Sequence, residues 1–255
     1  MIAVISPAKT LDFETGTSIS WSTIPEYLSD SQKIINVLKK LSSEEVQTLM
    51  NISGNLADLN LERYAAWSKK METPEAKQAL LAFKGDVYIG LDAASFTVSD
   101  LEFAQDHLRI LSGLHGLLRP MDLIRPYRLE MGTKLPVNGS ENLYKFWGSK
   151  ITKLLNKALK EAACPVLINL ASDEYFKSIQ PKELKAKVIK PVFKDFKNDK
   201  YKVISFFAKK ARGMMGAYMI KNRLADPEQL KLFDWEGYAF NEPLSNKNEW
   251  VFTRG

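Results

Sequence analysis

Two short apolar runs, far apart in the chain, set the strongest limit on how this sequence can fold. Ile2–Ser6 is apolar and is ended by Pro7, and Pro165–Leu170 is a second run of the same kind. Runs of this length bounded by breaking residues are typical of strands that are buried on both faces. The first run therefore predicts a buried N-terminal strand, and the second predicts a central strand.

Helix signals occupy most of the first half of the chain. Capping boxes are expected at Ser42–Glu45 and at Ser99–Glu102, where a hydroxyl and an acidic side chain stand three residues apart. Thr73 and Asp226 each precede a proline, which suits a helix start. Consecutive short helices are predicted from Pro25 to about Phe83, and longer ones at 143–159 and 208–223.

Several further strands are expected. Residues 86–90 form a brief one, and residues 188–196 and 201–207 form a hairpin that turns at Asn198-Asp199. Residues 238–240 and 250–252 are closing strands. The strands and helices do not alternate regularly, as a dinucleotide-binding fold would require. The sequence predicts one mixed α/β (α+β) domain over residues 1–255, with a mixed sheet surrounded by helices.

Sparse metal ligands and a single thiol exclude several function classes. Cys164 is the one cysteine, so neither an intramolecular disulfide nor a multi-cysteine metal site is expected, and a reducing cytoplasm fits best. With two histidines, His107 and His115, no zinc or iron cluster is apparent. No apolar window reaches the roughly 18–20 residues of a membrane helix. We expect a cytoplasmic protein without metal, cofactor or membrane contact.

Positive charge is concentrated in one stretch. The chain carries a net charge of +6, whereas Lys177–Arg212 alone holds twelve Lys/Arg and three Asp/Glu, a local +9 that leaves −3 for the remainder. Such a concentration is expected of a protein that binds a phosphate backbone. The alternative is a lysine-rich surface that serves only solubility.

A glycine-containing turn is the next candidate. Gly113 and Gly116 follow a predicted helix, and glycine amides can meet a phosphate at a tight turn. The segment Leu111–Pro120 therefore resembles a helix-hairpin-helix element, flanked by Arg109, Arg119, Arg125 and Arg128. Ile52–Ala57 is a second candidate with one glycine. The alternative for both is a structural turn.

A polar cluster follows the predicted central strand. Asn169–Tyr175 holds Asp173, Glu174 and Tyr175, and the C-terminal ends of buried strands are favoured ligand sites in α/β proteins. Lys9 and Lys209 would complete a pocket in which Asp173 or Glu174 acts as general base. The alternative is an ion-pair network that closes the fold.

Seven motifs in order resemble the YaaA family over essentially the whole chain. They are Ile5–Asp12, Ala82–Tyr88, Leu111–Leu114, Leu118–Pro120, Pro126–Met131, Asn169–Tyr175 and Ala208–Gly213. The resemblance implies a mixed α/β fold with a positive cleft and a helix-hairpin-helix element. It also implies hydrogen peroxide resistance, through lowered unincorporated iron and less damage to DNA and protein.

Three hypotheses follow. The first is a protein that binds double-stranded or distorted DNA with low sequence specificity, through Arg109, Gly113, Gly116, Arg119, Arg125, Arg128, Lys190, Lys209, Lys210 and Arg212. The second is an enzyme that acts on a nucleotide or another anionic small molecule, in a pocket formed by Lys9, Asp173, Glu174, Tyr175 and Lys209. The third is an iron-binding protein, against which the scarcity of histidine and cysteine argues. The sequence does not set the oligomeric state.

Overall fold

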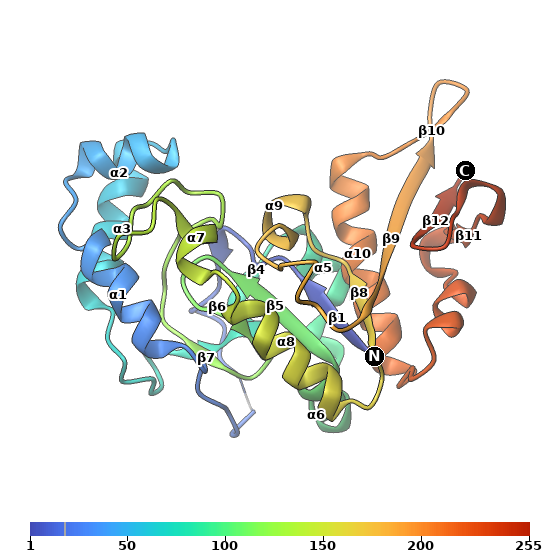
Figure 1. Cartoon of the computed structure of the whole chain (residues 1–255), viewed down its shortest axis with the longest axis horizontal. Coiled ribbons are helices and arrows are strands. Elements are labelled where there is room, and N and C mark those ends of the chain that lie inside the picture. The colour runs from blue at the N-terminus through green and yellow to red at the C-terminus, as the bar shows by residue number, and fades with distance from the viewer. Residues whose placement is uncertain (18) are drawn as a thin grey trace.

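A mixed eight-stranded sheet forms the centre of the molecule (Figure 1). The computed structural model describes residues 1–17 and 19–255. The strand order is β11 (Ala239–Phe240), β12 (Glu249–Arg254), β9 (Lys187–Phe196), β8 (Val166–Asn169), β1 (Ile2–Ile5), β5 (Leu108–Ser112) and β6 (Gly116–Leu118), and β10 (Tyr201–Lys202) pairs with β9. The inner pairs are parallel and the outer ones antiparallel. The predicted mixed α/β class is confirmed.

The two apolar runs form buried strands, as predicted, and the structure shows that they are neighbours in the sheet. Strand β1 pairs in parallel with β8 on one side and with β5 on the other, and every residue of β1 is fully buried. Such strands need cover on both faces. Strand β9, nearer the edge, instead alternates: Ile189 and Phe193 are buried, whereas Lys190 and Lys194 are half-exposed.

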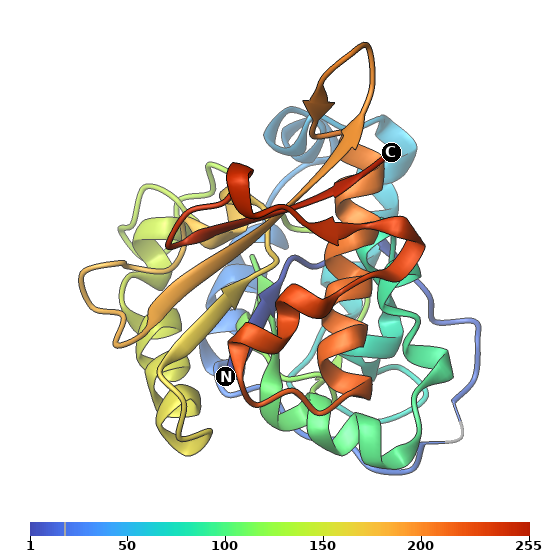
Figure 2. The same ribbon diagram turned by 90° about the vertical axis from the view of Figure 1, so that its right-hand side faces the viewer.

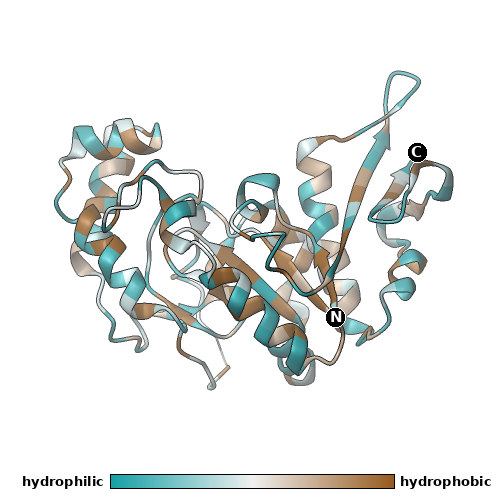
Figure 3. Cartoon of the chain, in the orientation of Figure 1, coloured by the Kyte–Doolittle hydropathy of each residue, from teal (hydrophilic) through white to brown (hydrophobic). Residues whose placement is uncertain are grey.

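Helices cover both faces of this sheet. Helices α5 (Asp86–Leu91), α6 (Val98–His107) and α10 (Ser205–Lys221) lie on one side, and α7 (Leu143–Trp147) and α8 (Lys150–Glu161) lie on the other (Figures 1 and 2). Apolar residues gather on the strands and on the inward faces of the helices, and polar residues lie outside (Figure 3). Among the helices of the described ranges, none combines the length and apolarity needed to cross a membrane.

Helices α5 and α10 approach each other unusually closely. A Cβ atom added to Gly213 would lie 1.8 Å from the Val87 carbonyl oxygen, and one added to Gly90 would lie 2.0 Å from the Lys210 carbonyl oxygen. Only glycine fits at both positions, because backbone atoms form the obstacle. This contact sets Lys209 and Arg212 of α10 beside the start of α5.

The remaining elements form a helical group at one end and short connections. Helices α1 (Leu28–Leu38), α2 (Ser43–Met50) and α3 (Gly54–Ala66) lie together at the left of Figure 1. The smaller elements are β2 (Thr10–Leu11), β3 (Lys77–Gln78), α4 (Ala79–Ala82), β4 (Phe83–Lys84), η1 (Ala93–Ser95), β7 (Leu123–Ile124), α9 (Asp173–Phe176), η2 (Pro227–Leu232), η3 (Trp235–Gly237) and η4 (Glu242–Leu244). The predicted capping box at Ser42 is present.

Some local predictions were wrong. Residues 86–90 form helix α5 rather than a strand, because the helix packs on α10. The capping box of α6 joins Thr97 and Asp100, two residues before the predicted one. The expected helix at 143–159 is divided at Gly148, whose φ is +48°. Pro74 lies in a turn rather than at a helix start, and Phe206 and Phe207 belong to α10.

Candidate functional site

The glycines predicted to hold DNA lie in a buried β-hairpin. Strands β5 and β6 flank the turn, so the helix-hairpin-helix prediction is not confirmed there. A Cβ atom on Gly113 would lie 2.5 Å from the Leu129 carbonyl oxygen, and one on Gly116 would lie 2.9 Å from the Trp147 ring. Trp147 also donates its indole N–H to the Gly113 carbonyl, at 2.9 Å. These glycines serve close packing, not contact with solvent.

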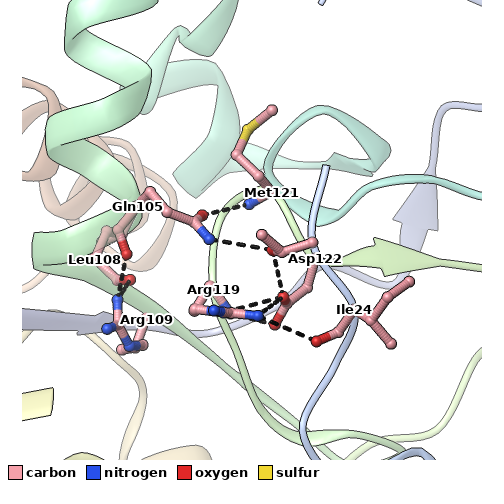
Figure 4. Close-up of polar contacts among 8 residues, drawn as sticks. Ile24, Gln105, Leu108, Arg109, Arg119, Met121 and Asp122 are labelled. Carbon is pink, nitrogen blue, oxygen red and sulfur yellow. Dashed lines mark hydrogen bonds and ion pairs between the residues drawn. The ribbon is translucent and has the colours of Figure 1, made fainter. Parts of the chain in front are cut away.

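Two of the predicted DNA-binding arginines also hold the fold together (Figure 4). Arg109 is only 7% exposed, and it donates to the carbonyls of Gln105 and Leu108, both at 2.7 Å. Burial lowers the pKa of Arg109 to about 10. Arg119 donates to the buried Asp122 carboxylate at 3.1 and 3.0 Å and to the Ile24 carbonyl at 3.1 Å. The prediction that Arg109 faces DNA was wrong.

The other two flanking arginines are engaged as well. Arg125 donates to the Lys70 carbonyl at 3.0 and 2.9 Å. Arg128 donates to the Glu130 carboxylate at 3.2 and 3.0 Å. The arginines around the buried hairpin thus all form hydrogen bonds within the protein.

The second glycine candidate does lie between two helices. Helix α2 ends at Met50, Asn51 adopts a left-handed backbone with φ of +51°, and α3 starts at Gly54. However, residues 43–66, which hold both helices, contain four acidic side chains and one basic side chain, Arg63. A surface of this charge repels a phosphate backbone, so the helix pair alone carries no case for DNA contact.

A cavity of about 390 Å³ lies at the C-terminal edge of the parallel strands β1 and β8. Ser6 follows β1 and Ser172 follows β8, and the Ser172 backbone N–H donates to the Ser6 hydroxyl at 2.9 Å. Tyr88 of α5 donates its hydroxyl to the Ser6 carbonyl at 3.1 Å. The cavity therefore occupies the place where α/β proteins commonly bind ligands.

The structure brings four of the five predicted pocket residues together. Their side chains line this cavity: Lys9, Glu174, Tyr175 and Lys209. Lys9 lies 3.3 Å from the Glu130 carboxylate, and Lys209 lies 3.8 Å from Asp86. Glu174 accepts the Gly132 backbone N–H at 2.9 Å. Burial raises the pKa of Tyr175, so its hydroxyl stays protonated and can donate.

Asp173 was wrongly placed in the pocket. Its side chain is 86% exposed and does not line the cavity. Its carboxylate accepts a hydrogen bond from the Lys190 ammonium group at 2.9 Å. The hydrogen bond from Lys190 lowers the pKa of Asp173, which suits an exposed ion pair and not a general base.

Glu130 and Arg212 are among the lining residues that the sequence analysis did not place in the pocket. Glu130 binds Lys9 and Arg128 through one oxygen, while its other oxygen is buried with no hydrogen-bond partner in the described ranges. Arg212 was predicted for DNA but lines the cavity. Both stand in motifs of the family resemblance, Pro126–Met131 and Ala208–Gly213, which was the one available signal.

A second cavity, of about 480 Å³, lies beyond β4 and α5. Its buried lysine, Lys77, donates to the carbonyls of Asp12 and Thr15, each at 2.8 Å. This lysine therefore tethers the loop after β2 and is not directed at a ligand. Within residues 1–17 and 19–255, no group of three or more His, Cys, Asp and Glu side chains could hold a metal ion.

The strongest candidate for an external binding surface is the lysine-rich hairpin of β9 and β10. It extends beyond the body of the molecule (Figures 1 and 2). Asn198 and Asp199 form its turn with φ values of +53° and +57°, as the sequence predicted. We call its lysines and exposed rings the basic hairpin: Lys194, Phe196, Lys197, Lys200, Tyr201 and Lys202. Of the nine lysines from Lys177 to Lys202, Lys190 alone forms an ion pair within the described part of the chain.

Comparison with known proteins assigns the chain to a family. The family model described as peroxide stress protein YaaA matches residues 1–244. The chain belongs to the YaaA family. Proteins named UPF0246 from Saccharophagus degradans, Teredinibacter turnerae and Ralstonia nicotianae are 56%, 54% and 54% identical over 254 residues, covering 100% of this chain and 99% of each relative. The membership supports a role of this YaaA-family protein in peroxide stress.

Proposed function

We propose that the protein binds DNA with low sequence specificity as part of its role in peroxide stress. The basic hairpin is the observation that carries this proposal. Lys197 and Lys200 stand exposed at its tip, Lys194 and Lys202 are half-exposed, and none of the four forms an ion pair within the described residues. Lysines of this kind can neutralise phosphates and release counterions.

Exposed aromatic rings lie between these lysines. Phe196 and Tyr201 are 51% and 37% exposed, and their ring centroids lie 5.3 Å apart. Rings interleaved with cations are typical of surfaces that stack on unpaired bases. The proposal therefore favours distorted or partly unpaired DNA over a regular duplex.

A charge-matched pair of variants tests the DNA proposal. Lys197→Glu/Lys200→Glu alters the basic hairpin, whereas Lys40→Glu/Lys153→Glu alters exposed lysines on α1's C-terminal side and on α8. Both double variants lower the net charge from +6 to +2, because each reversal removes two charges. In a gel shift at low salt, only the first should lose roughly tenfold or more in affinity. Equal loss in both, or no binding by the wild type, contradicts the proposal.

We also propose that the protein lowers unincorporated iron, as the family resemblance implies. This role places the protein in the bacterial cytoplasm. Iron would be measured in whole cells that lack the protein, after complementation with the wild type or with Lys197→Glu/Lys200→Glu. If the variant restores low iron, DNA binding and iron control are separate properties. If it does not, the two are linked through the basic hairpin.

A second candidate function is an enzyme that acts on a nucleotide or another anionic small molecule. It is supported by the meeting of Lys9, Glu174, Tyr175 and Lys209 around one cavity. Glu174, not Asp173, would be the general base, because the Asp173 carboxylate lies outside the cavity. Turnover of a nucleotide panel, lost in Glu174→Gln and retained in Asp173→Asn, would support it, and absence of turnover by the wild type would reject it.

A further inference from the structure

The cations around the cavity at β1 and β8 are not all paired. Its lining holds four cations, Lys9, Lys84, Lys209 and Arg212, against three carboxylates, Asp86, Glu130 and Glu174. Lys9 is paired with Glu130, Lys209 lies near Asp86, and Lys84 lies 3.9 Å from Asp12. The remaining cation is Arg212.

Among the arginines of the described residues, Arg212 and Arg63 have no hydrogen-bond or ion-pair partner, and of these two only Arg212 lines the cavity. Across residues 1–17 and 19–255, its guanidinium forms neither a hydrogen bond nor an ion pair, although it is half-buried. Burial lowers its pKa, and the nearby Asp173 charge partly offsets this effect. Asp173 itself is held by Lys190. A desolvated guanidinium gains most from a bidentate oxyanion, which matches its fork of donors.

The rest of the lining suits an organic ligand. Beside the charged groups, the cavity presents Ala8, Val87 and Leu170 with the side chains of Tyr88 and Tyr175. A volume of about 390 Å³ is within the usual range for small-molecule sites. The lining therefore combines an anion-binding side with a less polar wall.

We infer that this cavity binds a small organic molecule through a terminal oxyanion, a phosphate or a carboxylate, held by Arg212 with Lys9 and Lys209 nearby. The inference rests on the second candidate function, but it requires binding and not turnover. The close α5–α10 contact fixes the backbone at Arg212 before the ligand arrives, so only the side chain has to become ordered on binding.

Isothermal titration calorimetry tests the inference with three probes: AMP, inorganic phosphate and succinate, in a buffer free of phosphate and carboxylate. AMP should bind at one saturable site and more tightly than inorganic phosphate, since its organic part meets the less polar wall. Tighter binding of succinate than of either phosphate compound would assign a carboxylate ligand. Saturable binding of none of the three overturns the inference.

Variants locate the site. Arg212→Gln should weaken binding by roughly 10- to 100-fold, because it removes hydrogen bonds to a charged group. Arg212→Lys should restore only part of the affinity, and Lys153→Gln on α8 should match the wild type. If Arg212→Gln does not fold, the exposed Lys209→Gln replaces it, with weaker binding expected. Equal affinity in the wild type and in a folded Arg212→Gln overturns the inference.

The test separates this inference from both proposed functions. Lys197→Glu/Lys200→Glu should bind AMP normally even where it no longer shifts DNA. Ligand binding without turnover rejects the enzyme and keeps the inference, whereas DNA binding without any bound probe rejects the inference alone.

Discussion

Two hairpins of this molecule both carry turn residues and cations in their sequences, but their surroundings in the fold are opposite. The hairpin of β5 and β6 has glycines and flanking arginines, and the basic hairpin of β9 and β10 has an Asn-Asp turn and lysines. The first is packed against Trp147 and the Leu129 backbone, and its arginines bind internal carbonyls and carboxylates. The second projects outward. Cations therefore indicate a binding surface only where the fold leaves them without internal partners.

At neutral pH, the largest expected effect is a difference in stability between variants of the two hairpins. Gly113→Ala places a Cβ atom 2.5 Å from the Leu129 carbonyl oxygen, so the backbone must shift. We expect a loss of about 1–3 kcal/mol in the free energy of unfolding, towards the upper end because a backbone atom is the obstacle. Asn198→Gly, at a positive φ that glycine accepts, should change it by less than about 0.5 kcal/mol. Urea denaturation of both variants measures the difference, and equal midpoints would show that the first hairpin is not tightly packed.

Of the two hairpins, the buried one should add a pH effect on stability that comes from a histidine. His115 is fully buried there beside Ser31, and burial lowers its pKa to about 3, from about 6.5 in the unfolded chain. Between these values the unfolded chain binds the extra proton. Stability is therefore greatest above pH 6.5 and falls as the pH drops towards 3, by up to about 1.4 kcal/mol per unit.

The matching variant is His115→Gln. Because carboxylates also titrate in this window, the quantity to measure is the difference in pH dependence between wild type and variant from pH 7 to 4. The wild type should lose more stability on acidification. Parallel curves would mean that His115 is charged in the folded protein.

A crossed pair of variants compares the two kinds of cation directly. Arg119→Gln removes donors to the buried Asp122, which retains the Arg119 backbone N–H and the Thr23 hydroxyl. A loss of about 1 kcal/mol in the free energy of unfolding is expected, with DNA affinity nearly unchanged. Lys197→Gln should show the reverse: stability within about 0.5 kcal/mol of the wild type and weaker DNA binding. If Arg119→Gln weakens DNA binding and Lys197→Gln does not, the DNA-binding surface lies at β5 and β6 instead of the basic hairpin.

The sequence predicted the central strands, the β9–β10 hairpin and most helices, because local periodicity and turn residues decide these elements. Residues 86–90 could not be predicted, since their helix depends on a close contact with α10, more than a hundred residues away. The pocket was largely predictable, because Glu174 and Tyr175 follow a buried strand. Arg109 and Arg212 could not be distinguished from other arginines, as only the folded chain shows which carbonyls or cavities they meet.

The smallest expected effect concerns one lysine at the tip of the basic hairpin. Lys200 is exposed and forms no ion pair in the described part of the chain, so Lys200→Gln should leave stability within about 0.5 kcal/mol of the wild type. If Lys200 contacts one phosphate, the slope of log affinity for DNA against log salt concentration should become shallower by about one. Lys153→Gln on α8 is the matched control, and its slope should equal that of the wild type. A common shift in both variants would mean that net charge, and not the hairpin, governs DNA affinity.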